Sequence, residues 1–172
     1  MNYRLEPFDR ADAATVLSWA RSADEREAWA AISEPDPDPE IFDRWNADTD
    51  VHAFGLLADG RLAGYGEVWV DREEEEAELA RLIVDPDVRD RGAGRTMVRL
   101  LSERARDLGY DDVWVRVVPS NARAIRAYAA AGFVRTTPEE ESSFNESQPR
   151  AYVWMRLATI SMTAPHDRAP DT

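Results

Sequence analysis

Apolar residues along this chain are spaced in two ways, and each spacing predicts one kind of secondary structure. Runs in which apolar residues alternate or follow one another predict strands, in chain order at residues 3–5, 51–58, 61–70, 77–84, 112–118, 133–135 and 150–157. The dipeptide Asp59-Gly60 separates two of these runs and is a strong signal for a hairpin turn. We therefore expect a sheet of six or seven strands.

Apolar residues three and four positions apart predict about four helices around this sheet. Asp9 and Asp38 are suitable N-caps for two short helices in the N-terminal part of the chain. A third helix is expected from Met97 to Leu108, and a fourth follows Asn121 and ends at Gly132. Strands and helices therefore mix along one chain, which predicts an α/β (α+β) domain.

The remaining segments are predicted to be loops or ends. The prolines of Glu34–Glu40 exclude a helix interior there. Residues Asp71–Glu76 are acidic except for Arg72, so we expect a solvated hairpin tip, and Thr136–Pro149 is expected to be a polar loop. The domain is predicted to span residues 1–157, and residues 158–172 to form a tail, either mobile or with a short strand extension.

The segment from Glu78 to Val134 contains the most informative pattern. A strand is followed by a turn, by Gly92 and Gly94, and then by a helix. Glycine allows a positive φ, and free amides at the start of a helix form a natural site for phosphate. Arginines at positions 89, 91 and 95 place cations around the same point. A tight turn before a packed helix would use the same two glycines, so spacing alone leaves both interpretations open.

The order of the next motifs resembles the GNAT (GCN5-related N-acetyltransferase) family. The resemblance covers roughly residues 50–157, and it is carried by Arg89-x-x-Gly92-x-Gly94, a helix, a strand, and then Asn121-x-x-Ala124-x-x-x-Tyr128-x-x-x-Gly132-Phe133. It implies a mixed, mostly antiparallel sheet in which the two central strands are parallel and splay apart. In this chain these strands would be residues 79–84 and 113–118.

The resemblance also implies a binding site for acetyl-CoA. The backbone of Leu82, Ile83 and Val84 would pair with the pantetheine arm as if with another strand. Asn121 would fix that arm or the end of the splayed strand. Backbone amides of the glycine-containing loop would hold the pyrophosphate, the residues being Arg89, Asp90, Arg91, Gly92, Ala93, Gly94, Arg95 and Thr96.

Acyl transfer to an amine needs a base and an acid. An alkylammonium group with a pKa near ~10.4 is almost fully protonated at neutral pH, and a departing thiolate is helped by a proton donor. The resemblance places the Tyr128 phenol beside the sulfur of the cofactor as that donor; a core tyrosine bonded to the backbone is the alternative. Glu78 is the candidate base, acting through water, and a water chain without a carboxylate is the alternative.

Composition excludes several other functions. The net charge is −13, and all 21 basic residues are arginine, which argues against nucleic-acid binding. Even so, residues 81–126 carry ten arginines against seven acidic residues, where an anionic cofactor would lie. No cysteine is present, and the two histidines lack ligand spacing, so no metal centre is expected.

Other features bear on location and on a rival activity. No apolar run approaches the ~20 residues that span a bilayer, and the first residues do not resemble a signal peptide, so we expect a soluble, cytoplasmic protein without membrane contacts. Gly92 and Gly94 lack a following Lys-Ser or Lys-Thr pair, which argues against a nucleotide hydrolase with a phosphate loop. The absence of lysine excludes autoacetylation of side chains.

We therefore expect an N-acetyltransferase that moves the acetyl group of acetyl-CoA to a primary amine of a small molecule, by direct attack in a ternary complex. A protein N-terminal acetyltransferase and a non-catalytic acyl-CoA-binding regulatory domain are the alternatives. Acyl-chain length is left open, as is assembly into a homodimer. In the resembling family the N-terminal part forms one wall of the acceptor site and differs between members. The resemblance therefore implies acceptor contacts from some of Trp19, Trp29, Phe42, Trp45, Glu34 and Asp36. The aromatic members of this set would otherwise be core anchors.

Overall fold

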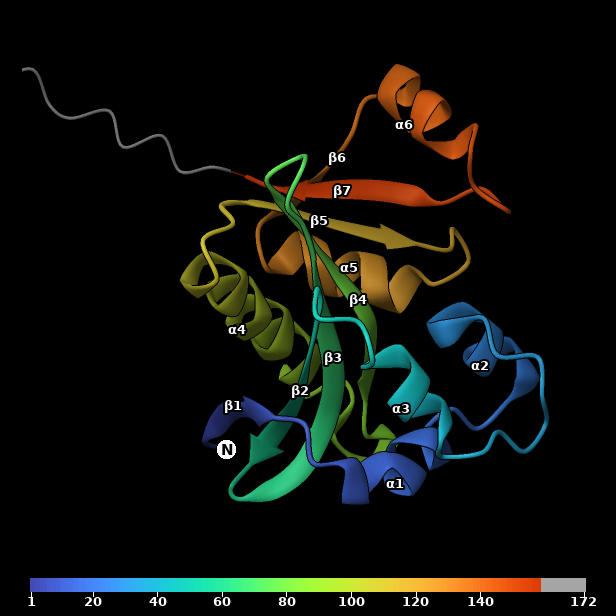
Figure 1. Ribbon diagram of the computed structural model, residues 1–172, viewed down its shortest axis with the longest axis vertical. Coiled ribbons are helices and arrows are strands. Elements are labelled where there is room, and N and C mark those ends of the chain that lie inside the picture. Colours follow the sequence, from blue (N-terminus) through green and yellow to red (C-terminus); the bar gives the residue numbers. More distant parts are fainter. Residues whose placement is uncertain (159–172) are drawn as a thin grey trace, which may run out of the picture.

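The computed structural model describes residues 1–158, which form one seven-stranded sheet with helices on both faces (Figure 1). Neighbouring strands follow the order β1-β2-β3-β4-β5-β7-β6, and only β4 and β5 pair in parallel. The strands are β1 (Tyr3–Pro7), β2 (Val51–Ala58), β3 (Arg61–Asp71), β4 (Glu76–Val84), β5 (Asp112–Val117), β6 (Phe133–Arg135) and β7 (Val153–Leu157). This topology confirms the predicted mixed, mostly antiparallel sheet.

Helices α4 and α5 cover one face of the sheet, and the other helices cover the opposite face in two groups. Helices α1 to α3 enclose a small core around Tyr65 and Ile83, whereas α6 packs through Phe144 on Trp114 and Trp154. The helices are α1 (Ala13–Ser18), α2 (Ala23–Ala30), α3 (Ile41–Trp45), α4 (Ala93–Asp107), α5 (Ala122–Ala130) and α6 (Pro138–Asn145), with 3₁₀ turns at Arg10–Asp12 and Pro86–Val88.

The six helices found in residues 1–158 exceed the predicted number of about four, and the predicted polar loop at 136–149 is wrong in part because it contains α6. Thr137 forms a capping box with Glu140, and Pro138 occupies the first turn. Three glutamates in that turn also suit the positive end of the helix dipole. These polar signals start the helix, but few apolar residues mark its face, so periodicity did not reveal it.

The central parallel strands separate after a short contact. β4 and β5 pair only at Glu76–Asp112, Ala77–Val113 and Glu78–Trp114, although β4 continues to Val84 and β5 to Val117. Beyond this point β4 pairs with β3 on its other edge, and β5 pairs with β7. The predicted splay is confirmed, and Figure 1 shows the two strands diverging.

A bulge in β4 changes which side chains face each side of the sheet. The register between β3 and β4 shifts between Tyr65 and Glu67, and Arg81 has a φ of 48°. As a result Arg81 points to the same face as Glu67, whereas Leu82 packs into the core under α4.

Two further expectations concern the ends of the chain and the membrane. Of the predicted tail at 158–172, all but the first residue lies outside the described residues. Across residues 1–158 there is no helix with the length and apolar character that crossing a bilayer requires.

Candidate active site

The separated ends of β4 and β5 lie beside the start of α4, which is the geometry expected for a bound phosphate. Gly92 is the N-cap of α4 with a φ of 84°, and no side chain caps the helix. Amides of the first turn therefore remain available to an anion, assisted by the helix dipole. Gly94 lies inside that turn without a positive φ, and Asp90, at 60°, is the other residue in the left-handed region. Of the two glycines, only Gly92 has the positive φ that the sequence predicted.

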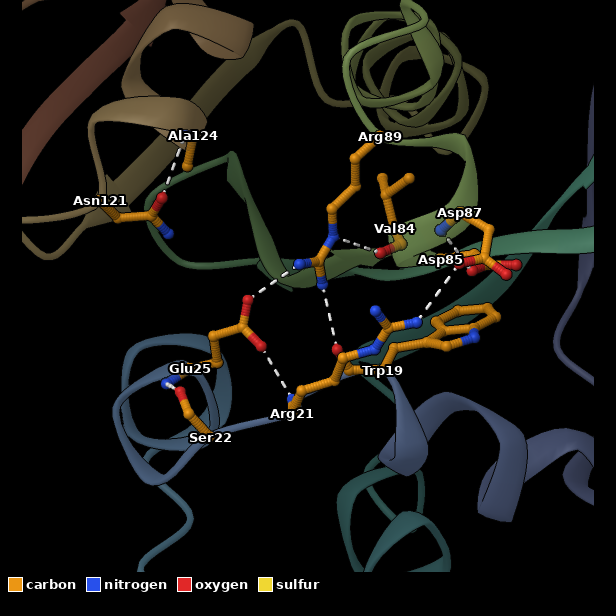
Figure 2. A network of polar contacts seen from close by, with 10 residues as sticks. All are labelled: Trp19, Arg21, Ser22, Glu25, Val84, Asp85, Asp87, Arg89, Asn121 and Ala124. Atoms are coloured by element: carbon orange, nitrogen blue, oxygen red, sulfur yellow. Dashed lines mark hydrogen bonds and ion pairs between the residues drawn. The ribbon is translucent and has the colours of Figure 1, made fainter.

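The Arg89 guanidinium does not lie free beside this loop but is bound on three sides (Figure 2). Its Nε donates to the Val84 carbonyl at 3.0 Å, and its terminal nitrogens donate to Glu25 at 2.8 Å and to the Trp19 carbonyl at 3.1 Å. Burial raises the pKa of Glu25, but hydrogen bonds from the Arg21 amide and from Arg89 outweigh it, so that pKa is lowered. Arg89 thus fastens the α1–α2 segment to the end of β4, a contact that sequence spacing did not reveal.

The other predicted cofactor residues surround the same gap. Arg91 and Arg95 are exposed beside the start of α4, where their charges can reach an anion. Asn121 caps α5, its side-chain oxygen accepting from the Ala124 amide at 3.1 Å (Figure 2). Leu82, Ile83 and Val84 lie beyond Glu78, the last residue of β4 that pairs with β5, so this part of the strand has no partner on the β5 side.

Glu78 occupies the last paired position before the strands separate. Its carboxylate lies 2.8 Å from Arg116 Nε, and its side chain is 21% exposed. Burial raises the pKa of Glu78 to about 7 even though Arg116 favours the charged form. A carboxyl group with this pKa can accept and release a proton at neutral pH.

Tyr128 lies on α5 with its side chain buried against Phe133. Burial, and then the nearby charge of Glu78, raise the pKa of Tyr128 above its ordinary value, so the phenol stays protonated. Tyr128 belongs to the main apolar core of the described residues, so its role as proton donor stays a prediction beside the alternative of a core tyrosine. The two candidate catalytic groups are close enough to influence each other electrostatically.

A buried carboxylate that sequence reasoning missed lies on the neighbouring strand. Glu67 is fully buried and accepts hydrogen bonds from the Tyr65 hydroxyl, from Trp69 Nε1 at 2.6 Å and from Arg81 at 2.8 Å. Tyr65, Glu67 and Trp69 alternate along β3, so they share one face of the sheet. The sequence did contain a signal for this site, because Glu67 is a single charged residue in the middle of an otherwise apolar strand.

The predicted acceptor residues divide into three groups. Trp19 and Phe42 are buried in the core under α1 to α3, as the alternative interpretation held. Trp29 donates to the Arg81 carbonyl at 2.7 Å, and Trp45 stacks on the Arg81 guanidinium, so both lie against the bulge in β4. Glu34 is exposed, and Asp36 lines a separate cavity of about 290 Å³ beside α1.

A cavity of about 340 Å³ opens where β5 ends. Residues from α2, the β5–α5 connection and the segment before β7 line it, namely Asp24, Glu27, Ala28, Val118, Pro119, Ser120, Arg150 and Ala151. Arg150 and Glu27 form an ion pair across it. The cavity is open to solvent, and Val118, the residue after β5, is part of its lining.

The family model described as the acetyltransferase (GNAT) family matches residues 15–133. Among characterised proteins, the chain is 37% identical over 82 residues to the [ribosomal protein bS18]-alanine N-acetyltransferase of Salmonella typhimurium, covering 48% of this chain and 54% of that protein. It is 34% identical over 87 residues to the streptothricin acetyltransferase of Streptomyces lavendulae, covering 50% and 46%. The matching part is about half the length of each relative.

Solved structures agree on the fold. The aminoglycoside acetyltransferase AAC(6')-Ib in complex with coenzyme A and kanamycin has a TM-score of 0.69 at 20% identity, with 91% of this chain and 95% of that chain covered. The ribosomal-protein-S18-alanine N-acetyltransferase of Escherichia coli has a TM-score of 0.63 at 22% identity, covering 94% and 99%. At such identities the likeness concerns the fold, and it is the family model that decides membership: the chain belongs to the GNAT family of acetyltransferases.

Proposed function

We propose that this protein transfers the acetyl group of acetyl-CoA to a primary amine, with Glu78 as the general base and Tyr128 as the general acid. The observation that carries the proposal is the position of Glu78, with a pKa of about 7, at the point where β4 and β5 separate. Tyr128 lies nearby with its proton retained. A proton acceptor and a proton donor therefore lie beside one gap in the sheet.

The reaction follows from these two groups. The amine nitrogen attacks the thioester carbon while Glu78 takes a proton from that nitrogen, directly or through one water. The carbon–sulfur bond then breaks, and Tyr128 gives its proton to the departing CoA thiolate. Proton transfers of this kind contribute rate factors of about 10²–10⁴ each.

The binding role of the loop supports the same proposal. Uncapped amides at the start of α4 suit the pyrophosphate, with Gly92 as the left-handed residue that turns them outward. The unpaired edge of β4 from Leu82 to Val84 suits the amide-bearing pantetheine arm. We assign both to acetyl-CoA, and residues 1–157 to one catalytic domain.

A small-molecule amine is the acceptor we favour. The cavity of about 340 Å³ at the end of β5 suits a ligand of that size, and relatives named for streptothricin and aminoglycosides act on small molecules. Other relatives are named as N-acetyltransferases of an alanine in a ribosomal protein. The N-terminal amine of a protein is therefore the second candidate acceptor.

Calorimetric titration with acetyl-CoA, followed by assay of thiol release against a panel of amines, tests the proposal. Saturable binding together with thiol release for one class of amine is the expected result. Binding without release for any amine would instead support a non-catalytic acyl-CoA-binding domain. Failure to bind acetyl-CoA would contradict the assignment of the loop.

A further inference from the structure

Arginine and aromatic side chains alternate in one continuous stack on the face of the sheet opposite α4 and α5. The Arg81 guanidinium lies 4.3 Å from the ring centre of Trp45 and 4.9 Å from that of Trp69. Arg116 lies 6.0 Å from the same Trp69 ring and 5.6 Å from two further rings. We call this set the arginine–aromatic stack; its members are Trp45, Arg81, Trp69, Arg116, Tyr152 and Trp154.

The stack crosses the sheet next to the candidate base. It begins on α3, passes over β3, β4 and β5, and ends at β7. Arg116 is the member that pairs with Glu78, and its side chain is 26% exposed. All members are partly exposed, so the stack reaches the surface beside the group that would take the proton of the amine.

The two carboxylates that contact the stack are already paired with arginine. Glu67 binds Arg81 and Glu78 binds Arg116, each at 2.8 Å. At the cavity mouth Glu27 binds Arg150, and in the described part of the chain Asp24 is the one cavity carboxylate without an ion pair. A polycation would need several free carboxylates to replace the water around its charges. Among the described residues, the stack itself offers an added cation no carboxylate that lacks an ion pair; Asp71 and Glu76, on the same face, lie at the far ends of β3 and β4, and Asp24 lies at the cavity.

We infer that the acceptor, given the function proposed above, is a single primary amine close to an aromatic ring. Such a ring stacks on tryptophan, on tyrosine and on the planar guanidinium groups of arginine. Its one ammonium group loses its proton to Glu78 and requires no further carboxylate. A free arylalkylamine and the N-terminal residue of a phenylalanine peptide share this chemistry.

Rates of thiol release at saturating acetyl-CoA distinguish these acceptors. The panel is 2-phenylethylamine, a tripeptide with N-terminal phenylalanine, spermidine and kanamycin. At least one of the two aromatic amines is expected to have a kcat/KM about tenfold or more above those of spermidine and kanamycin. A tenfold ratio equals about 1.4 kcal/mol. A higher kcat/KM for spermidine or kanamycin overturns this acceptor class while leaving acetyl transfer intact. Release with none of the four, although acetyl-CoA binds, overturns it as well.

Tyr152 provides a matched pair of variants because, among residues 1–158, no hydrogen bond is found for its hydroxyl. Tyr152→Leu removes the ring and is expected to raise the KM of the preferred amine about fivefold or more, with little change in kcat or in acetyl-CoA affinity. Tyr152→Phe keeps the ring, so its KM for the same amine should stay close to that of the wild type. Equal effects of both variants, or a fall in kcat with an unchanged KM, would overturn the stacking role.

Discussion

The two faces of the sheet contribute to the candidate site in different ways. The face under α4 and α5 offers backbone groups, namely the uncapped amides that follow Gly92 and the part of β4 without a β5 partner, together with one buried phenol. The opposite face offers paired charges and stacked rings from five separate elements. The cofactor side therefore depends on backbone conformation, whereas the acceptor side depends on which side chains are present. Substitutions on one side should therefore change cofactor binding without changing acceptor binding, or the reverse.

The largest effect is expected for Glu78→Gln. Loss of the base should lower kcat/KM about 10²–10³-fold, while acetyl-CoA affinity by calorimetry stays unchanged. Glu76→Gln is the matched control, because Glu76 lies two residues earlier on β4 and also has a pKa raised by burial. Similar losses in both variants would contradict the assignment of Glu78.

Tyr128→Phe should have the next largest effect. Removing the proton donor is expected to lower kcat about 10–100-fold, with acetyl-CoA affinity again preserved. The ring still packs against Phe133, so the melting temperature should change little. An unchanged kcat would show that the thiolate leaves without help from Tyr128.

Gly92→Val tests cofactor binding, and valine at Gly60, in the turn between β2 and β3, is its control. Gly92 and Gly60 both have a φ of 84° and open space around an added Cβ, so valine at either should cost about 1–2 kcal/mol in folding stability. Only Gly92→Val is expected to weaken acetyl-CoA binding, by about tenfold or more, equivalent to about 1.4 kcal/mol. Equal affinities in the two variants would argue against phosphate binding at the start of α4.

The smallest effect is expected for Thr137→Ala, which removes the cap of α6. Loss of that capping box should lower the free energy of unfolding by about 1 kcal/mol, measured by chemical denaturation. Acetyl-CoA affinity should not change, because α6 packs on the acceptor side. A large loss of cofactor affinity would mean that the two faces are more tightly coupled than the structure indicates.

The same division explains what the sequence predicted. The strand, loop and helix around Gly92 are continuous in the chain, so local patterns and a family resemblance located them. Arg89 was predicted beside the phosphate, yet its guanidinium binds Glu25 and two carbonyls, since those partners lie far away in sequence. The arginine–aromatic stack was missed for a similar reason: a bulge at Arg81 turns that side chain onto the acceptor face, which strict alternation along β4 does not foresee.

The pH dependence of catalysis tests the central claim most directly. Below its pKa of about 7 the Glu78 carboxyl already holds a proton and cannot accept one from the amine. The ratio of wild-type kcat/KM to that of Glu78→Gln cancels the ionisation of the amine itself. We expect this ratio to rise with pH, pass its midpoint near pH 7 and then level off. A ratio that stays constant from acid to alkaline pH would contradict Glu78 as the base.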